Sequence, residues 1–217
     1  MNSTRAIFSR ELKGFFNSPM AYIFLVIFAL VNGYFFTNTF FLFGQSDLRA
    51  LFDIVPLVYL FFIPAVSMGL ISREKSIGTM EIMATLPLSS FEFVMGKFLA
   101  ALSLILLALF STSIHFLTLL SVGTNVDHGA VLCGYLGLAL MGATYAAIGT
   151  YASSVTENQV VSFIIGVFLV LVFFMLDKTL LFVPYSLAGI IQFLAVDYHL
   201  SNIAVSYTHL TLPTRYR

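Results

Sequence analysis

The chain has 217 residues, of which 59% are hydrophobic and 9% are charged, and its ten basic side chains balance its ten acidic ones. A soluble globular domain carries roughly a quarter charged residues, and a surface with so few charges would expose large apolar patches, so the composition predicts an integral membrane protein. The neutral balance gives no basic field for nucleic acid, and a single cysteine, Cys133, excludes an intrachain disulfide and a cysteine-rich metal site.

Residues 1–19 have the pattern of an amphipathic helix that lies on a membrane surface. Apolar side chains such as Ile7 and Phe8 recur at helical spacing. Four charged side chains are interspersed among the apolar side chains of this segment: Arg5, Arg10, Glu11 and Lys13. No small-residue cleavage site follows the first apolar stretch, so this segment is not expected to be a cleaved signal peptide. Pro19 marks the turn into the first span.

Five charge-free apolar stretches follow, and each approaches the roughly 20 residues that a helix needs to cross a bilayer. They run over residues 20–41, 54–71, 98–120, 130–153 and 159–176. A sixth apolar stretch, residues 179–196, is interrupted by Pro184 and Gly189 and is interpreted as a re-entrant or interfacial segment. The sequence therefore predicts an all-α, polytopic membrane fold with at least five transmembrane helices, in one domain over residues 1–204.

The positions of Lys and Arg predict the orientation of these helices. Within residues 1–204, and so leaving out Arg215 and Arg217, two basic residues, Arg49 and Lys178, fall on one side of the predicted spans, and six fall on the other: Arg5, Arg10, Lys13, Arg73, Lys75 and Lys97. Cytoplasmic loops are enriched in Lys and Arg. The N-terminus and the loop of residues 72–90 are therefore expected in the cytoplasm.

This loop concentrates charge in a chain that otherwise has little. Residues 79–86 are expected to form a short helix that Pro87 ends, and Ser89 and Glu92 have the spacing of a capping box at the start of the next helix. The short helix would present apolar side chains in a loop that faces water: Ile77, Met80, Ile82, Met83 and Leu86. An apolar stripe in such a place predicts a docking surface for a partner.

The segment REKSIGTMEIMATLPLSSFEFVMGKFLA, with the preceding FFIPAVSMGLIS and the start RELKGFFNSPMAYIF, resembles the permease subunit of type-2 ATP-binding-cassette exporters. The resemblance covers residues 1–204 and is strongest to the gliding-motility-associated branch and to related exporters with an auxiliary subunit. It implies that residues 72–90 hold a coupling helix that docks into an ATPase subunit. The candidate coupling residues are Arg73, Glu74, Lys75, Gly78, Thr79 and Glu81. The candidate residues of the connecting helix are Arg5, Arg10, Glu11 and Lys13.

The function that the resemblance implies is that of a permease subunit in the bacterial inner membrane, which exports a substrate by using ATP hydrolysis on a separate subunit. The expected partners are that ATPase, a second permease copy or a paralogue, an auxiliary membrane subunit and membrane lipid. The chain has no G-x-x-x-x-G-K-[ST] phosphate loop. ATP and magnesium are therefore expected on the partner, and no cofactor, metal or catalytic residue is expected on this chain.

Two other classes of protein remain as alternatives. An ion-gradient-driven secondary transporter usually has charged groups near the bilayer midplane. A membrane-embedded enzyme would need a nucleophile with a base, or a metal-binding pair of the H-E-x-x-H kind, within the spans. The predicted spans contain neither arrangement.

The last thirteen residues, VSYTHLTLPTRYR, differ from the rest of the chain because they are polar and contain no span. The run VSYTHLTLPT matches the translation of a transposon-end sequencing adaptor. Residues 205–217 are therefore interpreted as an artefactual tail. The resemblance implies six spans, so a sixth span is expected to have been lost with the natural C-terminus.

Two further features within the spans have predicted structural roles. Four glycines lie on one face of the fourth span and are expected to allow close packing within the subunit: Gly134, Gly137, Gly142 and Gly149. His115 in the third span is expected to be a neutral imidazole that hydrogen-bonds to a neighbouring helix.

Overall fold

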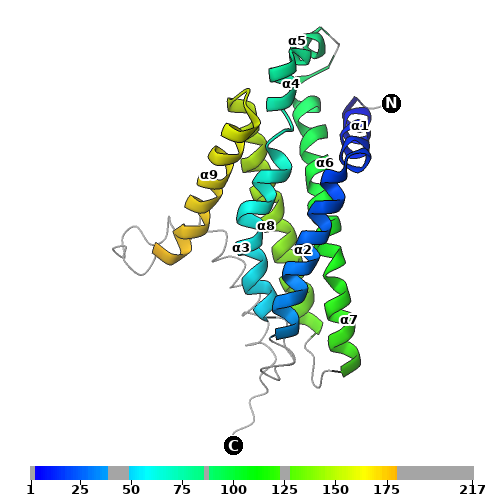
Figure 1. Cartoon of the computed structure of the whole chain (residues 1–217), viewed down its shortest axis with the longest axis vertical. Coiled ribbons are helices and arrows are strands. Elements are labelled where there is room, and N and C mark those ends of the chain that lie inside the picture. Colours follow the sequence, from blue (N-terminus) through cyan, green and yellow to red (C-terminus); the bar gives the residue numbers. More distant parts are fainter. Residues whose placement is uncertain (1–2, 39–48, 86–87, 123–127, 180–217) are drawn as a thin grey trace, which may run out of the picture.

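The computed structural model describes residues 3–38, 49–85, 88–122 and 128–179, which form helices and no strand (Figure 1). The helices of these ranges are α1 (Ser3–Asn17), α2 (Pro19–Thr37), α3 (Arg49–Ser67), α4 (Ser72–Ile77), α5 (Thr79–Ala84), α6 (Ser90–Ser111), α7 (Ser113–Val122), α8 (His128–Val155) and α9 (Gln159–Thr179). The predicted sixth stretch beyond Thr179 and the tail of residues 205–217 lie outside the described residues.

Within the described ranges, five helical segments are long and apolar enough to cross a membrane. They are Pro19–Thr37, Leu51–Ile77, Ser90–Val122, His128–Val155 and Gln159–Leu176. Each corresponds to one predicted span, and together with α1 they confirm an all-α, polytopic membrane protein. The second and third spans begin earlier than predicted because charged residues lie near their N-terminal ends, Asp53 in one and Glu92 and Lys97 in the other. A search for charge-free stretches leaves these parts out.

The predicted capping box at the start of α6 is confirmed. The Ser89 hydroxyl accepts a hydrogen bond from the Glu92 backbone N–H at 3.2 Å, and the Glu92 carboxylate accepts one from the Ser89 backbone N–H at 3.1 Å. These two bonds satisfy backbone donors that the first turn of a helix leaves free. They fix the start of α6 at Ser90, eight residues before the predicted span.

Helix α8 lies at the centre of the bundle and packs against α3, α6 and α9. The four predicted glycines are buried, and Gly134, Gly142 and Gly149 face α3 or α6, as the prediction of close packing within the subunit requires. A Cβ atom at Gly149 would lie 2.8 Å from the Ser67 Cβ, and one at Gly142 would lie 3.1 Å from Ile105 Cγ2. Any larger residue at Gly149 would therefore force α3 and α8 apart.

The prediction that His115 hydrogen-bonds to a neighbouring helix is wrong. The imidazole forms no hydrogen bond with the described residues and instead stacks on the Phe36 ring of α2, with centroids 4.6 Å apart and planes 24° apart. An aromatic contact of this kind packs α7 against α2 without requiring a donor or an acceptor on that helix.

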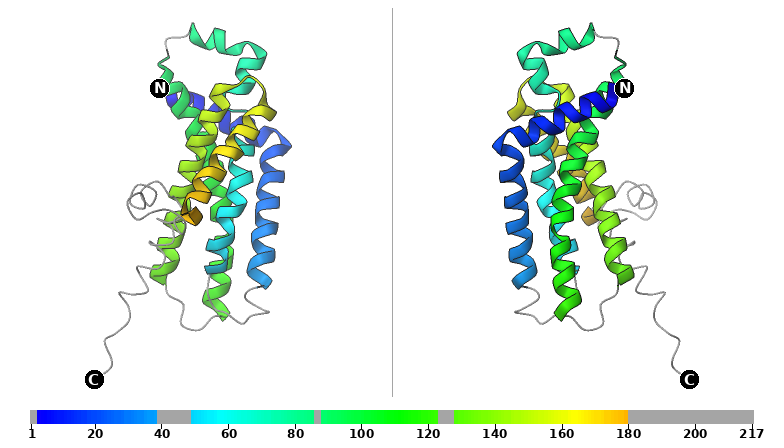
Figure 2. Two further views of the ribbon diagram at one scale, coloured as in Figure 1. Left: turned by 90° about the vertical axis from the view of Figure 1, so that its left-hand side faces the viewer. Right: turned by 90° about the vertical axis from the view of Figure 1, so that its right-hand side faces the viewer.

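Helix α1 lies across the bundle, whereas the long helices run along it (Figure 2). It packs against α6, where Ile7 is buried and approaches Gly96. A Cβ atom at Gly96 would lie 2.8 Å from Ile7 Cγ2, so glycine is what allows this contact. The predicted amphipathic helix is thus present, and its position across the long axis is that of an interfacial helix.

Candidate functional site: a charge cluster at the elbow of the second span

The second span bends into α4 at residues 68–71, and this elbow is held by a serine from a distant helix. The Ser153 hydroxyl of α8 accepts hydrogen bonds from the backbone N–H groups of Ile71 and Ser72, at 2.9 and 3.0 Å, and donates one to the Met68 carbonyl at 2.9 Å. It therefore does for α4 what a capping residue does within one helix. Because this cap comes from elsewhere in the chain, the local sequence pattern did not predict α4.

Lys75 fastens α4 to the same end of α8. Its ammonium donates a hydrogen bond to the Ser154 carbonyl, in the last turn of α8. A cation is stabilised at a helix C-terminus by the free carbonyl groups and by the helix dipole. Lys75, a predicted coupling residue, is thus engaged with the helix bundle.

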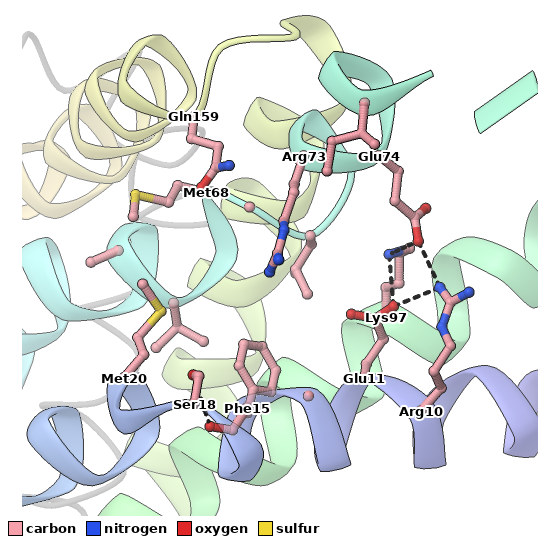
Figure 3. A pocket seen from close by; sticks show the side chains of 16 residues that line it. Arg10, Glu11, Phe15, Ser18, Met20, Met68, Arg73, Glu74, Lys97 and Gln159 are labelled. Atoms are coloured by element: carbon pink, nitrogen blue, oxygen red, sulfur yellow. Dashed lines mark hydrogen bonds and ion pairs between the residues drawn. The ribbon is translucent and has the colours of Figure 1, made fainter. Parts of the chain in front are cut away.

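Four charged side chains from α1, α4 and α6 form what we call the ion cluster: Arg10, Glu11, Glu74 and Lys97 (Figure 3). Arg10 Nη2 lies 2.8 Å from Glu11 Oε1 and 2.6 Å from Glu74 Oε1. Lys97 Nζ lies 3.0 Å from each of the same two oxygens. Each cation therefore bridges both carboxylates, and the cluster has no net charge.

Burial makes these contacts strong. The side chain of Lys97 is 1% exposed and those of Glu74 and Glu11 are 15% and 20% exposed. An ammonium group out of water is costly unless it is paired and hydrogen-bonded. Lys97 meets this condition only when α1 and α4 are both in place, and its ammonium also lies 5.1 Å from the Phe93 ring centroid.

The cluster shifts the protonation of its members in α1. Burial disfavours the Glu11 carboxylate, but the nearby Lys97 and Arg10 outweigh this, and the pKa of Glu11 lies below its ordinary value. Burial also disfavours the Arg10 guanidinium, but Glu11 and Glu74 raise the pKa of Arg10 above its ordinary value. Both groups are therefore charged at neutral pH.

Beyond α4 the chain turns at Gly78 into α5, which lies at the tip of the structure (Figure 1). Gly78 has a left-handed φ of 77°, which favours glycine, and its N–H donates to the Lys75 carbonyl at 3.1 Å. Met80 and Met83 pack against an apolar cluster that contains Ile71 and Phe93. Ile77, the last residue of α4, and Glu81 of α5 are exposed, so this end of the structure presents an apolar residue and an acidic residue.

The structure brings together only some of the predicted site residues. Arg10 and Glu11 of the connecting helix meet Glu74 of the coupling segment, and the Thr79 hydroxyl donates to the Glu74 carbonyl at 3.2 Å. The other predicted residues, Arg5, Lys13, Arg73 and Glu81, are exposed and lie outside the ion cluster.

Sequence reasoning missed Lys97 and Ser153 as members of the site. A signal for Lys97 was available, because a lysine followed by a long apolar stretch must find a counter-charge when its helix packs. The sequence does not show which carboxylates Lys97 contacts, since Glu11 is 86 residues away along the chain. Ser153 gave no local signal.

A cavity of about 300 Å³ lies beside the ion cluster, between the start of α2, the elbow and the start of α9 (Figure 3). Phe15, Met20 and Val66 contribute apolar wall, and Gln159 contributes an amide. Arg73 points into this space from α4 (Figure 3). The cavity thus combines an apolar part near α2 with a charged part near α4.

The fold and the ion cluster define a multi-pass membrane protein in which a surface helix, an elbow segment and a span are joined by paired charges. The family model described as ABC-2 family transporter protein matches residues 5–213. The chain therefore belongs to this family of membrane transport components, as the resemblance predicts. A search of curated proteins and a search of solved structures each found no match.

The family match runs through residue 213 and so includes most of residues 205–217. It therefore lends no support to the interpretation of residues 205–217 as adaptor. That interpretation stays a prediction, and sequencing of the parent gene tests it.

Proposed function

We propose that this chain is the permease subunit of an ATP-driven export system in the bacterial inner membrane, with ATP and magnesium bound by a separate ATPase subunit. The family match and the excess of Lys and Arg at one side of the spans support this proposal. Helices α1, α4 and α5 lie at that same end of the bundle (Figure 2). In this orientation the N-terminus is cytoplasmic.

Within this proposal, α4 and α5 form the surface that docks into the ATPase. Glu81 is the contact residue, because it is exposed on α5 while Met80 and Met83 are packed against the permease itself, whereas Ile77 ends α4 and lines the cavity beside the ion cluster. Glu74 and Lys75 anchor the base of this segment, and Gly78 and Thr79 set the turn between its two short helices.

The ion cluster is the observation that carries the mechanism. A movement of α4 displaces Glu74, and Glu74 is bonded to Arg10 of α1 and to Lys97 of α6. Ser153 passes the same movement to α8. Closure of the ATPase subunits would thus tilt three helices together, which is the rigid-body change that alternating access requires.

The remaining partners follow from the resemblance. The permease acts as a pair, with a second copy or a paralogue, and an auxiliary membrane subunit belongs to the gliding-motility-associated branch. The outward faces of α2 and α9 are apolar and exposed. These faces would contact either lipid or a second permease.

Substitution of Glu81 by Arg tests the docking surface. In a complex reconstituted with the ATPase, E81R should insert normally but lose the coupling between ATP hydrolysis and transport, because the change reverses the charge at the tip. The matched control is E157R, since Glu157 is exposed in the turn between α8 and α9 at the same end. Wild-type coupling in E81R would reject α5 as the docking element.

Crosslinking tests the contact directly. In a C133S background, which removes the native cysteine, a cysteine at Thr79 should crosslink to a cysteine in the ATPase. It should also be protected from a membrane-impermeant thiol reagent that is added outside intact cells. Labelling from the outside would overturn the proposed orientation.

A further inference from the structure

We infer that the cavity beside the ion cluster binds the headgroup of an anionic phospholipid, with its phosphate at Arg73 and an acyl chain along the apolar wall near α2. The inference rests on the membrane orientation given under the proposed function, and not on any contact with the ATPase. It assigns to Arg73 a role different from the docking role that the sequence suggests.

The charge balance of the cavity wall identifies the sign of the ligand. The four members of the ion cluster cancel one another. Arg73 is the remaining charged residue of the wall, and it makes no ion pair or hydrogen bond within the part of the chain that the structure describes. The wall therefore carries one unpaired positive charge, which a phosphate diester would neutralise through the two parallel N–H donors of the guanidinium.

The donors around the cavity suit a phosphate diester. Gln159 lines the opposite side of the cavity from Arg10 and Glu11 (Figure 3). Its amide also has no partner among the residues that the structure describes. An amide N–H and a guanidinium on two sides of one cavity can both donate to the same phosphate group.

The position of the cavity favours a lipid over a small soluble anion. Helix α1 lies across the bundle at the level where α2 begins, so this level corresponds to the headgroup region of the membrane (Figure 2). The wall of the same cavity includes Phe15, Met20 and Val66, which offer an acyl chain an apolar surface. A small anion would leave that surface unused.

Gly14 provides a way to fill the cavity without disturbing the fold. It lines the cavity, and a Cβ atom built at this position would meet no other atom within 4 Å. Replacement by Leu would therefore place a side chain in the space that the lipid would occupy, and it would also favour the helix, since glycine is a poor helix former.

The test is lipid binding by the full chain purified in detergent, followed by native mass spectrometry and by thermal unfolding. Dioleoyl phosphatidylglycerol should remain bound and should raise the melting temperature more than dioleoyl phosphatidylcholine does. R73Q should lower phosphatidylglycerol occupancy about tenfold, because a hydrogen bond to a charged group contributes free energy of that order. G14L should abolish the preference for phosphatidylglycerol without lowering the melting temperature of the lipid-free protein.

Two control variants keep the test specific. G14A leaves most of the cavity open, and R5Q removes a charge from the same helix at a different groove, which Arg5 lines with Leu99. Both should retain wild-type preference for phosphatidylglycerol. Equal effects of the two lipids, wild-type preference in G14L, or an equal shift with glycerol 3-phosphate would each overturn the inference. A permease that shows the lipid effect but never associates with an ATPase would refute the proposed function alone.

Discussion

The middle of the bundle and its charged end hold helices together by different means. In the middle, Gly142 of α8 lies against Ile105 of α6 and Tyr59 of α3, so the helices approach closely through packing and no charged groups take part. At the charged end, α1, α4 and α6 meet through the ion cluster, with the nearly inaccessible Lys97 at its centre.

This difference follows from the surroundings of each region. Lipid tails are as apolar as leucine, so only close packing distinguishes one apolar helix contact from another in the middle of the membrane. Near the membrane surface, paired charges are tolerated. They also make the contact specific, because each charge accepts few partners. The middle is therefore suited to a permanent contact, and the charged end to one that can be exchanged.

Among the substitutions that test this comparison, removal of Lys97 should lower the free energy of unfolding most. K97M leaves Glu11 and Glu74 facing one another in a half-buried site with only Arg10 to balance them. Loss of one partner from a buried pair costs about 3–5 kcal/mol of the free energy of unfolding. Thermal unfolding in detergent should show a large fall in melting temperature.

A second substitution separates charge from packing at the same site. The double variant K97M/E74Q restores a neutral cluster, with Arg10 paired to Glu11. Much of the lost stability should return, because a neutral amide no longer repels Glu11. A double variant as unstable as K97M would show that the lysine acts through packing and not through its charge.

The close contact between α3 and α8 should be the next most sensitive point. G149A places a methyl group against Ser67, and overpacking of this kind costs about 1–3 kcal/mol. The control is G33A, where the added Cβ would lie 3.8 Å from the His115 ring, an ordinary contact. G33A should therefore unfold at the wild-type temperature or slightly above it, and equal losses in both variants would mean that close packing is not the cause.

The serine cap of the elbow should have a smaller effect. S153A leaves the N–H groups of Ile71 and Ser72 without their acceptor, and loss of a helix cap costs about 1–2 kcal/mol. S154A is the control, since among the described residues that hydroxyl bonds only to the Tyr151 carbonyl in its own helix. Hydrogen exchange at Ile71 and Ser72 should accelerate in S153A and not in S154A.

The smallest expected effect is the change in the free energy of unfolding that pH causes through the ion cluster. Because the pKa of Glu11 in the folded protein lies below its ordinary value in the unfolded chain, its contribution to the free energy of unfolding is present above the unfolded pKa and is lost as the pH falls through the lower folded pKa. Thermal unfolding of wild type and E11Q should differ at neutral pH and converge in acid. A difference that persists at acid pH would argue against ionisation as its source.

The arrangement of the spans could be predicted from the sequence because the bilayer imposes a length and an apolar composition on each helix. Local signals also located the amphipathic helix, the capping box at Ser89 and Glu92, and the glycine face of α8. Each of these features depends on residues that are close in the sequence, so no knowledge of the tertiary structure was needed.

The candidate site was predictable only in part. The charged segment around Glu74 and the connecting helix with Arg10 were found, but their meeting through Lys97 was not, since that contact joins three separate helices. Helix α4 was missed because Ser153, its cap, lies 81 residues away from Ser72. In each case the missing information was tertiary and not local.

The order of the ion cluster along the chain has a consequence for biosynthesis. Glu11 and Glu74 both precede Lys97, the former by 86 residues. Segments emerge from the ribosome in chain order and N-terminal parts fold first. When the third span enters the membrane, Glu11 and Glu74 have already been synthesised. The ammonium group of Lys97 can therefore pair with both carboxylates as soon as this span inserts.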